Sequence, residues 1–107
     1  MIFLLLCSCA VKKTGVNSND LLNTNWNYSD IDAKYEVKFR KGGRLLITNP
    51  NDVTNDNDTW EQKGAIVYFY YNDKYSTYEG WFVGQDTIIG TGKNKNDKWE
   101  FKMVREK

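Results

Sequence analysis

Histidine is absent from the 107-residue chain, and cysteine occurs only at Cys7 and Cys9. Without histidine the chain lacks the usual general base, the Ser-His and Cys-His nucleophile systems and the commonest zinc ligand. From residue 21 onward there is no cysteine, and therefore neither a disulfide nor a thiol nucleophile. These absences count against most enzyme classes. We expect no cofactor, no metal and no catalytic residue.

The chain also lacks an excess of one charge. Fifteen Lys and Arg against 14 Asp and Glu give a net charge of +1. The basic residues are scattered among acidic ones instead of forming the stripe that phosphate backbones require, so a nucleic-acid partner is not expected. No apolar run approaches the ~20 residues of a membrane-spanning helix. The length predicts one domain, too small to fold around a large cofactor.

The first residues carry the most specific signal. A short apolar run ends in Leu6-Cys7-Ser8-Cys9 and then turns polar. This resembles a bacterial lipoprotein signal, in which a large aliphatic residue lies three positions before the acceptor cysteine. Cys9 fits as the lipidated residue, because Leu6 lies at minus three and Ser8 at minus one. Cys7 fits less well, because Leu6 would occupy the position that must be small.

The resemblance implies a membrane-anchored lipoprotein of the cell envelope that faces the periplasm or the cell surface. Two or three acyl chains hold a protein to a membrane stably, whereas one does so only marginally. The alternatives are an ordinary secretory signal or a fragment of an apolar strand. A signal peptide has a positive n-region and about 7–15 apolar residues, and both are deficient here. We therefore expect the true start to lie upstream.

Three segments follow from this interpretation: a signal over residues 1–9, a flexible tether over 10–20 and a β-barrel domain over 21–107. The tether is polar and contains Gly, Ser and Asn without periodicity. In the domain, short aromatic and β-branched runs alternate with turn residues, which is typical of all-β folds. We predict eight strands near Asn25–Tyr28, Lys34–Arg40, Arg44–Thr48, Thr59–Lys63, Ala65–Tyr71, Lys74–Val83, Thr87–Thr91 and Lys98–Arg105.

The connections are mostly short, which favours an antiparallel up-and-down meander that closes into a barrel and leaves no open edge. Lys41-Gly42-Gly43 suits a three-residue hairpin that places Phe39 opposite Leu45. The longest connection, Asn49–Asp58, is interpreted as a solvated loop, with a weak cation site as the alternative because the calcium-loop pattern is missing.

The hairpin around Asn72-Asp73 defines the candidate binding surface. A two-residue turn pairs Tyr71 with Lys74 and Tyr70 with Tyr75. Because an unpaired buried carboxylate is costly, the face that carries Glu79 should be outside. The interior then holds Val67, Phe69, Tyr78, Gly80 and Phe82. The outer face holds an aromatic strip formed by Ile66, Tyr68, Tyr70, Tyr75 and Trp81.

Exposed apolar clusters often mark interaction sites, and Tyr and Trp suit protein hot spots or sugar stacking. We therefore predict Tyr68, Tyr70, Tyr75 and Trp81 as binding residues. The alternatives are cross-strand aromatic pairing that serves stability alone, or a strip covered by the tether.

Leu22-Asn23-Thr24-Asn25-Trp26 resembles the first-strand L-x-G-x-W motif of lipocalin-like barrels, with Asn25 in place of Gly. The later pattern is similar to small lipocalin-like domains of bacterial secreted and lipid-anchored proteins, on Thr59 to Gly64, Val67-x-Phe69, Tyr78-x-Gly80, Gly90-Thr91-Gly92 and Trp99-x-Phe101. The resemblance implies an eight-stranded barrel in which Trp26 plugs one end. The inward aromatic residues predict a largely filled interior.

The leading function hypothesis is a lipid-anchored, non-enzymatic binding module for a small apolar ligand, a glycan or an envelope protein. The alternative is an inhibitor or accessory subunit that inserts Asn49–Asp58 into its target. The least favoured hypothesis is an enzyme that uses two carboxylates, which glycoside hydrolysis requires at about 5–9.5 Å from each other. Its candidates are Glu36, Glu61, Glu79 and Glu100.

Overall fold

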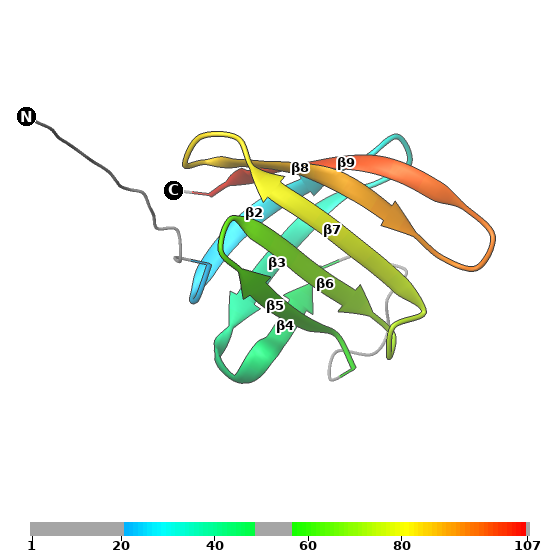
Figure 1. The fold of residues 1–107 in the computed structure, drawn as a ribbon, viewed down its shortest axis with the longest axis horizontal. Helices are drawn as coiled ribbons and strands as arrows, with labels where there is room; N and C mark the ends of the chain where they lie inside the picture. The colour runs from blue at the N-terminus through cyan, green and yellow to red at the C-terminus, as the bar shows by residue number, and fades with distance from the viewer. Residues whose placement is uncertain (1–20, 49–56, 107) are drawn as a thin grey trace, which may run out of the picture.

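The computed structural model describes residues 21–48 and 57–106 of the chain. Eight antiparallel strands follow one another around a closed barrel, each paired with its neighbours in sequence and the last with the first (Figure 1). The strands are β2 (Thr24–Ser29), β3 (Lys34–Arg40), β4 (Arg44–Ile47), β5 (Thr59–Lys63), β6 (Ile66–Tyr71), β7 (Ser76–Phe82), β8 (Thr87–Lys93) and β9 (Lys98–Arg105). The predicted all-β meander barrel is confirmed. Cys9, the tether and residues 49–56 of the long connection lie outside the described residues.

The tight turns explain why neighbouring strands pair. The three-residue η3 (Lys41–Gly43) joins β3 to β4, and Gly42 adopts a φ of 76° there. This connection sets Phe39 opposite Leu45 and Val37 opposite Ile47, as predicted.

The β6–β7 hairpin differs from its prediction. Its connection has four residues, and Tyr71 pairs with Ser76 and Tyr70 with Thr77. The two-residue turn and the Tyr70–Tyr75 pair were therefore wrong. Asn72, Asp73 and Lys74 all have positive φ, so the turn is longer. The register slipped by two positions, and because side chains alternate with a period of two, every residue kept its face.

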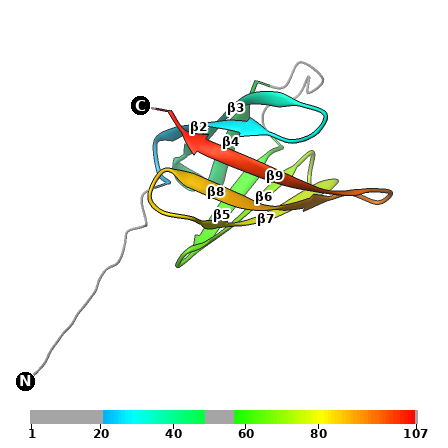
Figure 2. The ribbon, with the colours of Figure 1, turned by 90° about the horizontal axis from the view of Figure 1, so that it is seen from above.

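The interior is filled by side chains from all eight strands, which wrap around it in both views (Figures 1 and 2). Its buried apolar residues are Leu21, Trp26, Tyr28, Val37, Phe39, Leu45, Ile47, Val67, Phe69, Tyr71, Tyr78, Ile88, Phe101 and Met103. Phe82 is only partly buried and packs against this core. A core this rich in aromatic rings supplies large apolar area from few residues, which suits a small domain.

Trp26 lies buried near the start of β2. Its indole Nε1 donates a hydrogen bond to the Thr24 hydroxyl at 2.8 Å. The Arg105 guanidinium, from the end of β9, lies 4.6 Å above the indole centroid, and the Phe82 ring meets it edge-on at 6.0 Å. A cation over an indole face is stabilising, so Trp26 joins the two ends of the described domain.

Two glycines allow β7 and β8 to approach closely on the inner side of the barrel, where Gly80 pairs with Gly90. A Cβ at Gly90 would lie 2.1 Å from the backbone oxygen of Glu79. Backbone cannot yield as a flexible side chain can, so this crossing requires glycine.

The weakest junction is between β4 and β5, where only Arg44 and Thr59 pair. The Leu45 amide donates to the Asp58 carbonyl at 3.1 Å, and the Trp60 indole donates to the Arg40 carbonyl at 2.8 Å. The Asp58 carboxylate is buried and accepts the Asn72 amide at 2.8 Å. The bond between Asp58 and Asn72 attaches the described end of the long connection to the β6–β7 turn.

Candidate functional site

The outer face of β6–β8 carries three of the four predicted binding residues. Tyr68 and Tyr70 lie on β6, and Trp81 lies on β7 opposite Ile66. Tyr75 does not join them in a strand, because it lies in the β6–β7 connection at the far end of the hairpin, 55% exposed. The strip is therefore shorter than predicted.

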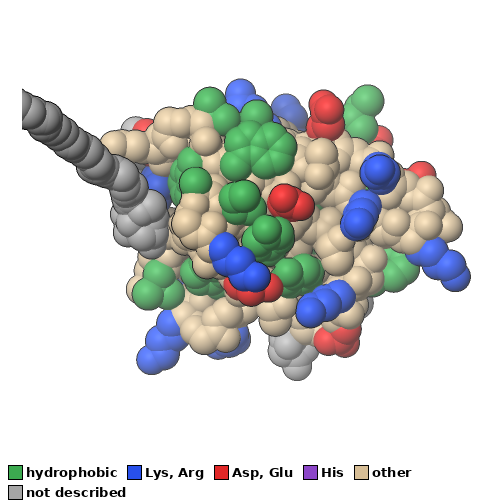
Figure 3. All heavy atoms as spheres, viewed as in Figure 1, with side chains coloured by type: hydrophobic (Ala, Val, Ile, Leu, Met, Phe, Trp, Pro, Cys, Tyr) green, Lys and Arg blue, Asp and Glu red, His purple; other side chains and the backbone are tan. Residues whose placement is uncertain are grey.

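The strip is also wider than predicted. On β8, Ile89 is the direct neighbour of Trp81, so Ile66, Trp81 and Ile89 form one row across three strands. Trp81 is 42% exposed and Ile89 36%. The exposed Val83 follows at the end of β7. In the space-filling view, hydrophobic side chains gather on this face (Figure 3). We call Ile66, Tyr68, Trp81, Val83 and Ile89 the apolar face.

Sequence reasoning missed Ile89, although a signal for it existed. Ile88 and Ile89 are consecutive, and a strand must direct one of two consecutive side chains outward. Ile88 is fully buried, which leaves Ile89 at the surface.

Lysines cover the outer tyrosine rings. The Lys63 ammonium lies 5.6 Å from the Tyr68 centroid, and the Lys74 ammonium lies 4.9 Å from that of Tyr70. The Tyr70 hydroxyl donates to the Glu61 carboxylate at 3.0 Å. Partial burial, together with this hydrogen bond, raises the pKa of Tyr70. Both rings are therefore engaged in contacts within the sheet, while the Trp81 indole is the large exposed aromatic group of this face.

Charged residues border the apolar face. Glu79 lies between Tyr68 and Thr91, and Lys102 lies beside Ile89 on β9. Basic and acidic side chains are visible around the hydrophobic ones in Figure 3. An apolar centre with a charged border is the usual anatomy of a protein–protein interface. Of the four glutamates considered for catalysis, Glu61, Glu79 and Glu100 have outward positions on β5, β7 and β9, and Glu36 lies on β3.

A cluster of tyrosines occupies the interior of the barrel. Tyr28 and Tyr35 stack with centroids 4.5 Å apart, and Phe69 and Tyr78 stack at 4.6 Å. The hydroxyls of Tyr35 and Tyr71 share a hydrogen bond of 2.8 Å. These distances are those of rings in van der Waals contact, so the rings themselves take up the space between the strands.

The Tyr28 hydroxyl is the centre of a buried polar chain. It accepts the Trp99 indole N–H at 3.1 Å and donates to the Asp30 carboxylate at 2.5 Å. Burial raises the pKa of Tyr28, and it raises the pKa of Tyr78 to about 12. Burial likewise raises the pKa of Tyr35 and of Tyr71. All four hydroxyls are therefore neutral at physiological pH and act as hydrogen-bonding groups, not as nucleophiles.

Comparison of the chain with protein-family models, with curated proteins and with solved structures gave no match. Within residues 21–48 and 57–106, no three Asp, Glu, Cys or His side chains are grouped so that they could hold a metal ion. In the same residues no helix has the length and hydropathy needed to cross a bilayer.

Proposed function

We propose that this chain is a lipid-anchored, non-enzymatic binding module of the cell envelope, and that it docks a protein partner through the apolar face. The observation that carries the proposal is the row Ile66–Trp81–Ile89, in which a half-exposed indole lies between two isoleucines. Tryptophan is the residue most enriched at binding hot spots, above all where surrounding contacts exclude water.

The contacts of this face favour a protein over the other ligand classes. A sugar would stack on a free aromatic face, but lysines lie over the rings of Tyr68 and Tyr70, and the exposed Trp81 indole lies between two isoleucines that offer a sugar no hydrogen bond. A small apolar ligand would need room inside the barrel, where stacked rings such as Phe69 and Tyr78 lie 4.6 Å apart. An apolar row with a charged border instead matches the surface of another protein.

The anchor is proposed from the lipobox Leu6-Cys7-Ser8-Cys9, and the lipocalin-like relationship from the Leu22 to Trp26 motif. Membrane fractionation tests the anchor: we expect Cys9→Ser to move the chain out of the membrane fraction, whereas the matched variant Cys7→Ser leaves it there. Retention of Cys9→Ser in the membrane would contradict lipidation at Cys9.

Docking is tested with the tagged full chain. The chain is extracted from the cell envelope in mild detergent and is purified together with the protein that it binds. We expect Trp81→Ser with Ile89→Ser to weaken the measured affinity at least about 30-fold, as for loss of a hot spot. The melting temperature should change little, because both side chains are outside the core. The control is Ile31→Ser, in the β2–β3 connection, where Ile31 is 90% exposed.

Two results would contradict this docking surface. Equal affinity of the double variant and the wild type would show that the row is not the interface. A large fall in melting temperature would show that it serves stability instead. If sedimentation shows a dimer that the double variant abolishes, the face joins two copies of this chain, and the proposal of a different partner is wrong.

The accessory-subunit alternative depends on Asn49–Asp58, of which residues 49–56 lie outside the described part, so it stays a prediction.

A further inference from the structure

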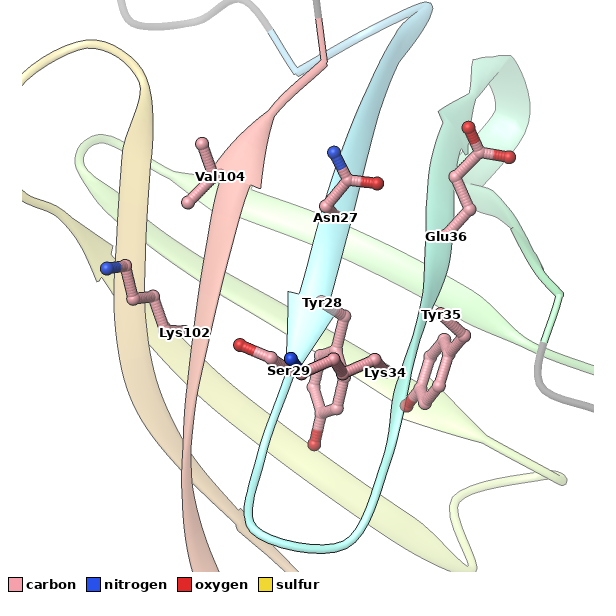
Figure 4. Close-up of a pocket in the computed structure, with 8 residues that line it drawn as sticks. All are labelled: Asn27, Tyr28, Ser29, Lys34, Tyr35, Glu36, Lys102 and Val104. Carbon is pink, nitrogen blue, oxygen red and sulfur yellow. The ribbon is translucent and has the colours of Figure 1, made fainter.

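A hollow of about 550 Å³ lies on the outer surface of β9, β2 and β3 (Figure 4). It adjoins the apolar face, because Lys102 on β9 pairs with Ile89 on β8. It forms because the middle strand, β2, carries the short side chains Asn27 and Ser29 on its outer face. The flanking strands carry the longer side chains of Lys34, Glu36 and Lys102 at the same level. The lining residues are Asn27, Tyr28, Ser29, Lys34, Tyr35, Glu36, Lys102 and Val104.

Strand register arranges these residues in two rows. Ser29 pairs with Lys34 on one side and with Lys102 on the other. Asn27 pairs in the same way with Glu36 and Val104. Adjacent strands lie 4.7–4.9 Å apart, which sets the two lysine Cα atoms about 10 Å apart with the small Ser29 between them. Figure 4 shows the Lys34 side chain extending across β2 toward Ser29, whereas the Lys102 side chain extends from β9 away from β2.

The two lysines have no carboxylate partner within the described part of the chain, where the ion pairs are Lys38–Glu36 at 3.6 Å and Arg105–Asp86 at 3.2 Å. Glu36, the one acidic residue of the hollow, is thus engaged by Lys38 from the side away from Lys34.

The row that contains Ser29 therefore carries two lysines, whereas the carboxylate of Glu36 in the row of Asn27 is already paired with Lys38. The rows are about 7 Å apart along the strands. An anion is attracted to the first row, above Ser29.

We propose that Lys34, Ser29 and Lys102 form a binding site for a phosphate group. The Lys34 ammonium beside the Ser29 hydroxyl, together with a second ammonium that Lys102 can bring in from β9, offers charge-assisted donors from three directions, which matches a tetrahedral oxyanion with several charged oxygens. Lysine suits this role because its compact ammonium carries three rotatable donors on a flexible stem. That stem allows Lys102 to turn over the hollow when the anion arrives. The site meets the apolar face at Lys102, beside Ile89, but phosphate binding does not depend on docking there.

The test follows backbone amide resonances of the full chain carrying Cys9→Ser while inorganic phosphate is added at constant ionic strength. Exposed ion pairs are weak, so we expect saturable shifts at residues 29, 34 and 102 with a Kd of about 1 mM. Lys34→Met with Lys102→Met should weaken binding about tenfold, and Ser29→Ala, which keeps both charges, about threefold.

The matched control is Lys93→Met with Lys98→Met. These lysines also face each other across adjacent outer strands, β8 and β9, but they do not flank the hollow. The control removes the same net charge, and its phosphate affinity should equal that of the wild type. Shifts that do not saturate, or that weaken equally in the two double variants, would show general screening by salt and overturn the site.

A second arm distinguishes the sources of the phosphate. Phosphatidylcholine vesicles with and without phosphatidic acid replace inorganic phosphate. A response to phosphatidic acid that is lost in the Lys34 and Lys102 variant identifies a lipid head group. A response to inorganic phosphate alone identifies a soluble phosphate compound, and no response to either probe would overturn the proposal.

Discussion

Two outer faces of the same barrel differ in what they present to solvent. The face of β6–β8 carries the row Ile66–Trp81–Ile89, whereas the face of β9, β2 and β3 carries Lys102, Ser29 and Lys34 at corresponding outward positions. Inward and outward side chains alternate along the strands of both faces, and both faces cover one continuous aromatic core. The fold therefore requires only the inward residues, and the outward ones are available for recognition.

The largest expected effect concerns the division between inward and outward positions on a single strand. Phe69→Ala should lower the free energy of unfolding by about 3–5 kcal/mol, as for loss of a buried aromatic ring. Its neighbour Tyr68 points outward, so Tyr68→Ala should cost less than about 1 kcal/mol. Urea denaturation measures both. Equal losses would mean that the outer face of β6 is also structural.

A second test asks whether the core behind the two faces is one unit. Tyr28 and Tyr35 lie behind the face of β9, β2 and β3, which we call the polar face. Tyr71 and Tyr78 lie behind the apolar face, and the Tyr35–Tyr71 hydrogen bond joins the two pairs. In the unfolded chain tyrosines ionise near pH 10, whereas burial raises the pKa of Tyr78 to about 12.

The folded state thus keeps protons that the unfolded state releases. This contribution is fully present below about pH 10 and is lost between about pH 10 and 12, by roughly 1–3 kcal/mol for each such tyrosine. We expect tyrosinate absorbance and circular dichroism to change together in one alkaline transition. Ionisation of buried tyrosines in a barrel that stays folded would contradict a closed core.

The smallest effect compares a buried hydroxyl with an exposed one. Tyr28→Phe removes the acceptor of the Trp99 N–H and the donor to Asp30, and should destabilise the barrel by about 1–2 kcal/mol. Tyr70→Phe removes only the exposed bond to Glu61 and should cost less than about 0.5 kcal/mol. Thermal melts of both variants measure the difference, and a larger cost at Tyr70 would reverse the assignment.

Much of the barrel was predictable because its strands alternate strictly. Phe101 and Met103 are buried and Lys102 exposed, as the last strand predicts. The β6–β7 register was not predictable, since Asn72-Asp73 suits a two-residue turn while the chain uses four residues, with Lys74 at φ 73°. The assignment of side chains to the inner and outer faces was still correct, because the register differed from the prediction by an even number of residues.

The candidate surfaces were only partly predictable. Trp81 was found from Glu79, whose charge places that side of β7 outside. Ile89 was not, because its place beside Trp81 depends on the register between β7 and β8. The hollow over Ser29 also depends on pairing between distant segments, since β9 closes the barrel against β2. No pattern within one segment of sequence specifies such a contact.

Photo-crosslinking in intact cells tests the central claim most directly. A photoreactive residue replaces Trp81 in one variant and Val104, an exposed apolar residue of the polar face, in the other. Docking through the apolar face predicts a discrete adduct with one envelope protein from position 81 and none from position 104, and predicts that Ile89→Ser suppresses the adduct. Equal crosslinking from the two positions, or none from position 81, would contradict it.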